Sequence, residues 1–415
     1  MKSFIFILPL LFALLAGCST DLEQNSRADI WKGLPNQLLT PDEVQTEISL
    51  KMHRVKDFLK TEGLDGMLLT QVRNFYWMTA GLANNQIVLN KDVGAASLLI
   101  MKDGSRFLIC SGSEAPRLMN ETLGKLGYTL RMYNWYEANP VKDTRGEIIK
   151  SIARGGKIGS DIDYPGTVNV ANQFKKLRYS LTDTEIKRYR WLGKQTTEAV
   201  ETVCRHLKPG MDEFRIEAMT AAEIRSRGIL PTVLLIGSDD RIYQYRHALP
   251  AGAKLKKYAM VNVVAEKWGM PIAVTRFVHF GPLPEELKSK LEKTARVNAY
   301  YQKATVPGAS TGDIFEMCKH WYAEVGFEGE WKKHHQGGAI GYDDREYVIY
   351  PGIREVVQEK QAFAWNPTIT GAKVEDTMIV YKDHFEVITR TDDWPTVDIK
   401  IDGKVYPQPA ILVVQ

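Results

Sequence analysis

The sequence predicts an α+β protein with two folded domains behind an N-terminal leader. At 415 residues the chain is long for a single core, so two domains are the default expectation. Short apolar runs alternate with helical patterns up to about residue 175, which predicts a small α/β domain over 40–176. Two helices and then a series of strand-like runs follow, which predicts a larger domain over 177–395 with helices packed on antiparallel strands. Residues 396–415 are expected to form a C-terminal extension packed on that second domain.

The N-terminus has a charged residue, an apolar stretch and then a cysteine. Lys2 precedes an apolar stretch, residues 4–15, which is too short to span a bilayer comfortably. The stretch leads into Leu-Ala-Gly-Cys18, the order of a lipobox, in which the cysteine takes a diacylglyceryl group and becomes the mature N-terminus. An ordinary cleaved signal with an incidental cysteine is the alternative. We therefore expect a signal peptide over 1–17, a membrane anchor on Cys18 and a polar tether over 18–39.

The residue after the cysteine favours one membrane. Ser19 occupies this position rather than an aspartate, and in lipoproteins of this kind that choice favours the outer membrane. We therefore expect an outer-membrane lipoprotein that faces either the periplasm or the cell surface.

The elements of the first domain begin with a helix. Thr40 and Glu43 form a capping box with Pro41 at the first helical position, and Gly63 is the expected end of the helix. Three apolar runs separated by turn residues then predict strands at 67–69, 96–101 and 106–110.

The second domain is expected to begin with two helices. Thr182 and Glu185 form another capping box, and the helix should reach His206 because Lys-Pro-Gly follows at 208–210. A second helix is expected from Asp212 to about Arg227. The strands expected after these helices cover 233–236, 260–265, 272–279, 347–349 and 378–381.

Composition narrows the class of partner. Hydrophobic residues make up 44% and charged residues 25% of the chain, as in ordinary water-soluble domains. The net charge is +4 and the basic residues are scattered, which argues against a nucleic-acid groove and favours a small-molecule or short-peptide ligand. Cys110, Cys204 and Cys318 are too far apart to suggest a disulfide framework or a zinc motif, although one bridge could form in an oxidising compartment.

Three stretches of the sequence, residues 73–81, 274–276 and 371–380, together resemble motifs of the family of aminopeptidase P, prolidase and creatinase. The stretch 73–81, Arg-Asn-Phe-Tyr-Trp-Met-Thr-Ala-Gly, is similar to a motif of the family's N-terminal domain. The stretch 371–380, Gly-Ala-Lys-Val-Glu-Asp-Thr-Met-Ile-Val, is similar to the strand that closes its catalytic domain, and Val-Thr-Arg at 274–276 also matches. The resemblance implies a creatinase-like N-terminal domain, a pita-bread second domain and a homodimer.

The resemblance also exposes a difference at the metal ligands. The family holds two divalent metals with two Asp, one His and two Glu. The aligned positions in this sequence are Asn262, Ala273, Gly338, Asn366 and Glu375. One carboxylate cannot balance the charge of two divalent ions in a desolvated cleft, so we expect no dinuclear metal site and no other cofactor.

Metal-independent chemistry then rests on a histidine. Creatinase, which shares the fold and has no metal, implies that His247 is the acid-base group, although a histidine that caps a loop is the simpler interpretation. Glu375 could assist catalysis by orienting or stabilising a cationic substrate group, or it could form a structural pair with Arg276. Asn262 and Asn366 would bind substrate through their amides, or they arose by neutral substitution in an inactive site.

Three further side chains are candidates for substrate binding. Adjacent residues point in different directions on extended chain, so we expect only one of His334 and His335 to face the site, and we favour His335. Arg345 could hold a substrate carboxylate, or it could belong to a solvated charge run. Arg276 is the third candidate.

Three functions remain open from the sequence. The first is a metal-independent hydrolase of a C–N bond in a small amide, amidine or peptide-like substrate. The second is a ligand-binding protein that has lost catalysis, and the third is a metallo-aminopeptidase of the Xaa-Pro type.

Overall fold

Residues 38–415 are described by a computed structural model. The predicted signal peptide, Cys18 and all but the end of the predicted tether lie outside the described residues. Among the described helices, none combines the length and apolar character that a membrane crossing requires.

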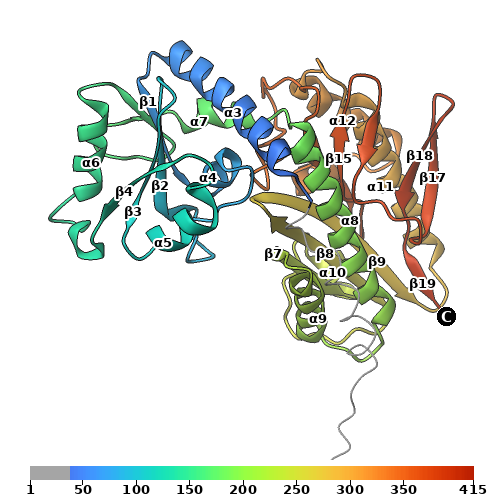
Figure 1. The fold of residues 1–415 in the computed structure, drawn as a ribbon. Coiled ribbons are helices and arrows are strands. Elements are labelled where there is room, and N and C mark those ends of the chain that lie inside the picture. Colours follow the sequence, from blue (N-terminus) through green and yellow to red (C-terminus); the bar gives the residue numbers. More distant parts are fainter. Residues whose placement is uncertain (1–37) are drawn as a thin grey trace, which may run out of the picture. The chain divides into compact units, whose positions relative to one another are not determined.

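The first domain is a mixed sheet flanked by helices (Figure 1). Its six strands are ordered β4-β3-β2-β1-β5-β6. β2 pairs antiparallel with β1 and β3, whereas β4, β5 and β6 each join by parallel pairing. The strands are β1 (Gly66–Gln71), β2 (Val93–Met101), β3 (Arg106–Ser111), β4 (Thr129–Tyr133), β5 (Ile158–Ser160) and β6 (Val168–Asn169). The helices are α3 (Pro41–Glu62), α4 (Val72–Met78), α5 (Ala115–Leu118), α6 (Thr144–Ala153) and α7 (Ala171–Phe174), with shorter turns η3 (Met119–Leu123), η4 (Trp135–Glu137) and η5 (Lys175–Arg178).

The predicted start and end of α3 are confirmed. The Thr40 side chain accepts a hydrogen bond from the Glu43 N–H, and the Glu43 side chain accepts one from the Thr40 N–H, which completes the capping box. Gly63 ends the helix at φ 63°, a left-handed conformation that glycine adopts without steric cost. The three predicted strands correspond to β1, β2 and β3.

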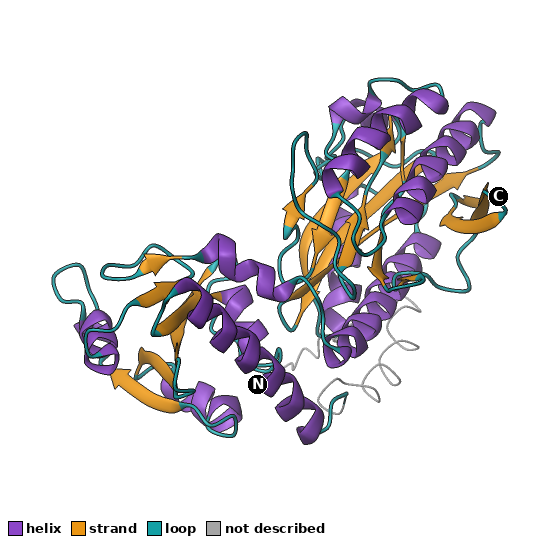
Figure 2. Ribbon diagram, turned by 90° about the horizontal axis from the view of Figure 1, so that it is seen from above, coloured by secondary structure: helices purple, strands orange, loops and turns teal. Residues whose placement is uncertain are grey.

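The second domain places helices against two sheets. One sheet has the order β19-β9-β8-β7 and the other has the order β11-β10-β12-β15-β16. The helices and turns are α8 (Asp183–His206), α9 (Glu213–Ser226), α10 (Asp240–Gln244), α11 (Glu285–Ala304), α12 (Thr311–Glu324) and η6 (Glu330–Lys333). The strands are β7 (Leu230–Ser238), β8 (Tyr258–Lys267), β9 (Met270–Phe280), β10 (Gly337–Ile340), β11 (Tyr347–Val348), β12 (Ala362–Trp365), β13 (Thr368–Ile369), β14 (Ala372–Lys373), β15 (Asp376–Val380), β16 (Phe385–Val387), β17 (Thr396–Ile401), β18 (Lys404–Pro409) and β19 (Leu412–Val414). Seen from above, helices flank the strands in both domains (Figure 2).

The predicted helix starting after Thr182 ends at His206, as expected, and all five predicted strands of this domain are present. One feature differs from the expected antiparallel arrangement. β19 pairs in parallel with β9, with Leu412 opposite Val278. The chain end therefore adds an edge strand to the sheet that carries the β8–β9 hairpin, whereas β17 and β18 pair with each other as a separate hairpin.

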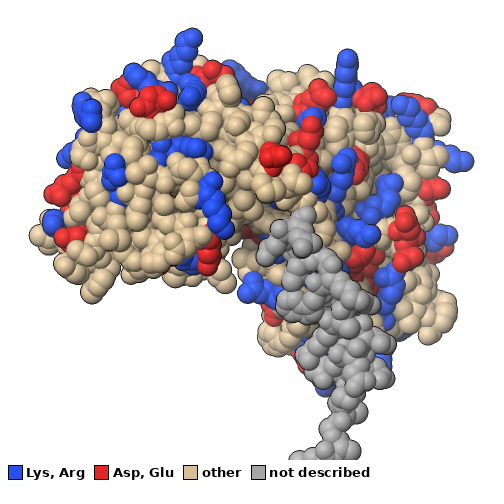
Figure 3. Space-filling model, in the orientation of Figure 1, with Lys and Arg blue, Asp and Glu red and all other residues tan. Residues whose placement is uncertain are grey.

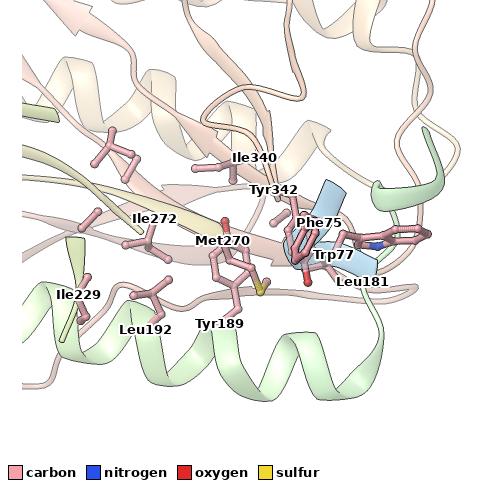
Figure 4. Close-up of a cluster of buried hydrophobic side chains, with 14 of the residues drawn as sticks. Phe75, Trp77, Leu181, Tyr189, Leu192, Ile229, Met270, Ile272, Ile340 and Tyr342 are labelled. Carbon is pink, nitrogen blue, oxygen red and sulfur yellow. The ribbon is translucent and has the colours of Figure 1, made fainter. Parts of the chain in front are cut away.

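The core that supports this hairpin lies against α8. Tyr189 and Leu192 on one face of α8 are buried against Met270 and Ile272 of β9 (Figure 4). Phe75 of α4 belongs to the same buried cluster, so the two domains share part of their core. Packing of this kind fixes the position of β9, and through it the residues described below.

A fully buried group of charges also ties the two domains together. The Lys51 ammonium on α3 lies 2.6 Å from Glu47 Oε1 and 2.7 Å from Glu185 Oε1. Arg188 on α8 donates to both Glu47 oxygens, at 2.8 and 3.0 Å, and the Tyr342 hydroxyl donates to Glu185 at 2.7 Å. Two cations and two carboxylates therefore balance one another away from water.

On the face seen in Figure 3, neither basic nor acidic side chains form one large patch. Lysine, arginine, aspartate and glutamate side chains are interspersed there.

Candidate active site

Backbone pairing brings the residues aligned with the family's metal ligands to one place. In the β8–β9 hairpin Asn262 lies opposite Thr275 and Ala273 lies opposite Val264. Paired residues share a face and alternate residues return to it, so Asn262 and Ala273 are on the same face. The Thr275 N–H donates to the Glu375 carbonyl at 3.0 Å, which fixes Glu375 beside this face.

The other two positions arrive through the second sheet. Trp365, the last residue of β12, pairs with Asp376, the first residue of β15. Asn366 directly follows β12 and Glu375 directly precedes β15, so the two are neighbours at this end of the sheet. Gly338 of β10 pairs with Ala364 of β12. The resembled family's ligand positions therefore converge here, but their side chains have different chemistry.

Glu375 is held by four side chains. Its Oε2 accepts from Asn262 at 2.6 Å and from Thr275 at 2.8 Å, and it lies 3.1 Å from the Lys373 ammonium. Its Oε1 accepts from Arg345 Nη2 at 3.3 Å. The Lys373 ammonium also donates to Asn262 Oδ1 at 3.3 Å, so it contacts both the amide and the carboxylate.

These neighbours keep the carboxyl ionised. Burial alone raises the pKa of Glu375, but the Lys373 ammonium and then the Arg345 guanidinium overcome that effect and hold the pKa at about 2. Glu375 is therefore a carboxylate at neutral pH. Because Lys373 and Arg345 are both cations, the immediate charge balance around this carboxylate is positive.

The expected alternative pairing of Glu375 with Arg276 is wrong. The Arg276 guanidinium donates to Glu201 at 3.0 Å and to Asp376 at 3.0 Å, and it is buried. The two side chains diverge because Arg276 and Thr275 are adjacent in a strand and point to opposite faces. Arg276, a candidate for substrate binding, thus has carboxylate partners within the fold.

Arg345 lies at the site and not in a solvated charge run. Its side chain is 16% exposed and it contacts Glu375. Arg345 Nε and Asn366 Oδ1 are among the buried polar atoms that have no hydrogen-bond partner within the described residues. Such atoms are uncommon in proteins, so each is available to a polar ligand.

Three histidines gather beside this charged group. His247 follows α10, and His334 and His335 lie in the link from η6 to β10. His334 Nε2 is 2.9 Å from His247 Nε2, and the His334 and His335 rings stack with centroids 4.3 Å apart. The expectation that only one of the adjacent pair would face the site is wrong. Strict alternation of side chains applies to regular strands. This link is irregular, and it leads into Gly337, the first residue of β10, which has a φ of 96°.

The surroundings favour neutral imidazoles. Partial burial and then Lys373 lower the pKa of His247, and Glu375 opposes them. Partial burial, followed by Lys373, lowers the pKa of His334 to about 3. Partial burial, followed by Arg345 and Lys373, lowers the pKa of His335 to about 4.

The residues present do not fit a dinuclear metal centre. The donor set offers a single carboxylate, and the Lys373 ammonium already contacts Glu375 and Asn262. At Gly338, a Cβ atom would come within 2.1 Å of the Tyr347 carbonyl oxygen and 3.0 Å of the Val348 Cα atom, so no larger side chain has room there. A pair of divalent ions at these positions would meet a fixed cation and too few anionic oxygens.

A cavity of about 230 Å³ opens next to the site. Asp344 lines it together with Arg73 and Glu266, and Asp344 precedes the Arg345 that binds Glu375. Burial, together with Asp344, raises the pKa of Glu266 to about 7. The hairpin tip at Trp268 packs on Trp191 of α8 and close to Gly81, so this tip contacts the first domain.

Two residues of the site were missed from the sequence. Lys373 stands two positions before Glu375, a spacing that places side chains on one side of an extended chain and could have revealed it. The other is His334. The orientation of its side chain depends on the irregular backbone before Gly337, and no pattern in the sequence predicts that backbone.

Two family descriptions match the chain. Residues 51–190 match the creatinase/prolidase N-terminal domain, and residues 187–382 match metallopeptidase family M24. An uncharacterized peptidase of Staphylococcus aureus (strain MW2) is 22% identical over 358 residues, which are 82% of this chain and 98% of that protein.

Solved structures show the same fold. The prolidase from Pyrococcus horikoshii OT3 superposes with a TM-score of 0.69 at 17% identity, covering 82% of this chain and 98% of that one. The Xaa-Pro dipeptidase from Bacillus anthracis superposes with a TM-score of 0.68 at 18% identity, covering 88% of this chain and 100% of that one. The pita-bread fold with a creatinase-like N-terminal domain, expected from the motifs, is confirmed.

Proposed function

Because the chain belongs to the family of creatinase, prolidase and aminopeptidase P, we propose that it hydrolyses a C–N bond without that family's dinuclear metal centre. The substrate is a small amide, amidine or peptide-like molecule. The observation that carries the proposal is the Lys373 ammonium, 3.1 Å from Glu375 and 3.3 Å from Asn262 at the aligned ligand positions. A fixed positive charge there can stabilise the oxyanion that forms when water attacks a carbonyl group.

His247 is the proposed acid-base group. As a neutral imidazole it takes a proton from water while the water oxygen forms the new bond to carbon. It then returns this proton to the substrate nitrogen as the C–N bond breaks. His334 Nε2, at 2.9 Å, restrains the His247 ring during both transfers.

The partnerless polar atoms support a role in substrate orientation. Arg345 Nε can donate to a substrate carboxylate, and the Asn366 amide can bond an N–H or carbonyl group. Asn262 is committed to Glu375 and Lys373, so its role is to hold those charges. His335 lies on the exposed side of the cluster, where it can contact substrate.

One observation favours the alternative of a ligand-binding protein without turnover. Both Glu375 oxygens are already occupied by partners within the fold, so this carboxylate has little capacity left for chemistry. The two functions predict different fates for a ligand. A binding protein returns it unaltered, whereas a hydrolase releases two products.

The test combines a chelator and a point variant. Protein dialysed against EDTA is incubated with a panel of Xaa-Pro dipeptides, N-acyl amino acids and guanidino compounds, and products are identified by mass spectrometry. We expect turnover of a panel member that chelation does not change, and loss of about 100-fold or more in His247→Ala. His320→Ala, an exposed histidine away from the cluster, is the matched control. Activity that chelation abolishes and Mn²⁺ restores, or full activity in His247→Ala, contradicts the proposal.

We also propose that the mature protein is an outer-membrane lipoprotein anchored through Cys18 and that it forms a homodimer. The lipobox order of residues 15–18 supports the anchor, and the family resemblance supports the dimer.

A further inference from the structure

The three histidines beside the charged group have a geometry of their own. One ligand nitrogen from each of His247, His334 and His335 lies within 4.8 Å of the other two. The ring centroids of His247 and His334 are 4.9 Å apart, with an interplanar angle of 82°. The Nε2 atoms of His247 and His334 face each other at 2.9 Å, and the His335 ring stacks on His334.

We propose that His247, His334 and His335 bind one transition-metal ion of the imidazole-preferring class, Zn²⁺, Co²⁺, Ni²⁺ or Cu²⁺. Imidazole nitrogen suits these ions, and three protein ligands with an open position form a recurrent zinc arrangement. None of the three residues occupies a position aligned with the family's metal ligands, so this site is separate from the one the fold has lost.

The His247–His334 pair needs only a small adjustment, and the His335 nitrogen, within 4.8 Å of the other two, moves closer when the ion binds. His247 Nε2 and His334 Nε2 are 2.9 Å apart, so these two nitrogens share one proton. In a tetrahedral zinc site with bonds of about 2.0–2.1 Å, neighbouring ligand nitrogens are about 3.3 Å apart. The ion takes the place of the shared proton when the pair separates by about 0.4 Å. His247 is an exposed residue, so its ring can make that movement.

The local interactions that the ion displaces are weak. The Gly337 N–H donates to His335 Nδ1 at 3.3 Å, a long hydrogen bond that is lost whichever nitrogen of this ring binds the ion. His334 Nδ1 is buried and has no hydrogen-bond partner among the described residues. A ligating imidazole usually donates through its other nitrogen, so this ring lacks the usual support, which lowers the expected affinity.

Charge selects against other ions and limits affinity. The cluster itself contains no carboxylate, so hard cations such as Mg²⁺ and Ca²⁺ find no oxygen ligands. The Lys373 ammonium lowers the pKa of all three rings, and Glu375, 3.1 Å from that ammonium, opposes it. Arg345 adds repulsion for His335, so removal of this guanidinium should tighten metal binding.

The site goes beyond the proposed hydrolysis and opposes it. An ion on His247 Nε2 leaves the ring proton on Nδ1, so the imidazole has no free lone pair to accept a proton from water. Metal binding and turnover therefore exclude each other. Binding is measured without substrate, and its failure is therefore distinguishable from failure of the proposed function.

The experiment uses tag-free full-length protein stripped with a chelator. We expect Co²⁺ titration to produce the visible absorption of a tetrahedral cobalt centre and to saturate at one ion per chain, and we expect Zn²⁺ to displace it. Mg²⁺ and Ca²⁺ should give no competition. His247→Ala and His335→Ala should lose more than about tenfold in affinity, because even second-shell partners are worth 10–100-fold. His320→Ala should bind as the wild type does.

Two results overturn the assignment. One is the absence of a saturable cobalt signal from protein whose circular dichroism shows that it is folded. The other is equal binding by wild type, His247→Ala and His335→Ala, which identifies an adventitious ion elsewhere on the chain.

Discussion

Glu375 sets the charge balance of the site, and its ionisation has a consequence for stability. Its pKa is about 2 in the folded chain, below the ordinary 4.5 of a glutamate. A lowered folded-state pKa contributes stability that is fully present above pH 4.5 and is lost as the pH falls from 4.5 toward 2. Glu375 is thus a stabilising carboxylate at neutral pH.

We therefore expect Glu375→Gln to lower the free energy of unfolding at pH 7 by about 3 kcal/mol, since it leaves Lys373 without its anionic partner. Urea denaturation at pH 7 and at pH 3 measures the effect. The difference from wild type should shrink at the lower pH. Glu285→Gln, at a carboxylate whose side chain is 85% exposed, is the control and should change little. An equal difference at both pH values contradicts the assigned ionisation.

Gly338 provides a second prediction at this scale. We expect Gly338→His to destabilise the protein by about 1–3 kcal/mol and not to create an Mn²⁺ site, because a Cβ there meets the Tyr347 carbonyl at 2.1 Å. Thermal unfolding and elemental analysis after dialysis check the two parts. Gly112→His is the matched control, since the nearest atom to a Cβ there is 3.5 Å away. Stoichiometric Mn²⁺ in Gly338→His shows that the crowding argument is wrong.

The sequence could predict which side chains replace the family's ligands, but not what those side chains contact. Asn262, Asn366 and Glu375 follow from motif spacing, and backbone pairing brings them together. The partner of Glu375 depends on the side of the strand to which each neighbouring side chain points. Lys373 points to the carboxylate of Glu375, whereas Arg276 points to Glu201.

Among helices and strands, the boundaries that could be predicted are helix ends with clear capping residues. Thr40 and Thr182 both form complete capping boxes. α11 and α12 were not assigned from the sequence, although Ser310 caps α12 by accepting from the Asp313 N–H. The parallel pairing of β19 with β9 joins segments far apart in the chain, and no local pattern encodes it.

The junction of α3 and α8 yields a prediction at this scale. We expect Lys51→Met to lower the free energy of unfolding by about 3–5 kcal/mol, because Glu47 and Glu185 would lose a buried cation. Chemical denaturation measures it. Lys60→Met, on the exposed side of the same helix, is the control and should stay within about 0.5 kcal/mol of wild type. A Lys51→Met variant as stable as its control would mean that the buried charges contribute nothing net.

The described residues form the family's fold around an altered site. Motifs at 73–81 and 371–380 were sufficient to predict both domains because they serve the fold. Asn74, for example, donates to Asp161 at 2.9 Å, and Asp376 binds Arg276 at 3.0 Å. Residues that hold the fold can persist while the reacting groups change.

The predicted leader is tested on the complete protein in a bacterial host. We expect the wild type to carry a diacylglyceryl group on Cys18 and to partition into the detergent phase of Triton X-114. The acyl chains supply an apolar anchor, whereas no described helix is long and apolar enough to cross a membrane. Cys18→Ser should move to the aqueous phase. Cys110→Ser, at a buried thiol in the first domain, is the control. A mature N-terminus elsewhere, without lipid, contradicts the prediction.

The close approach of β11 to Gly338 also bears on protein engineering. A design that installs the family's metal ligands would have to move β11 away from Gly338 and replace Lys373 in the same variant. The strand and the cation each obstruct a pair of metal ions, so single substitutions should not be enough to build that centre.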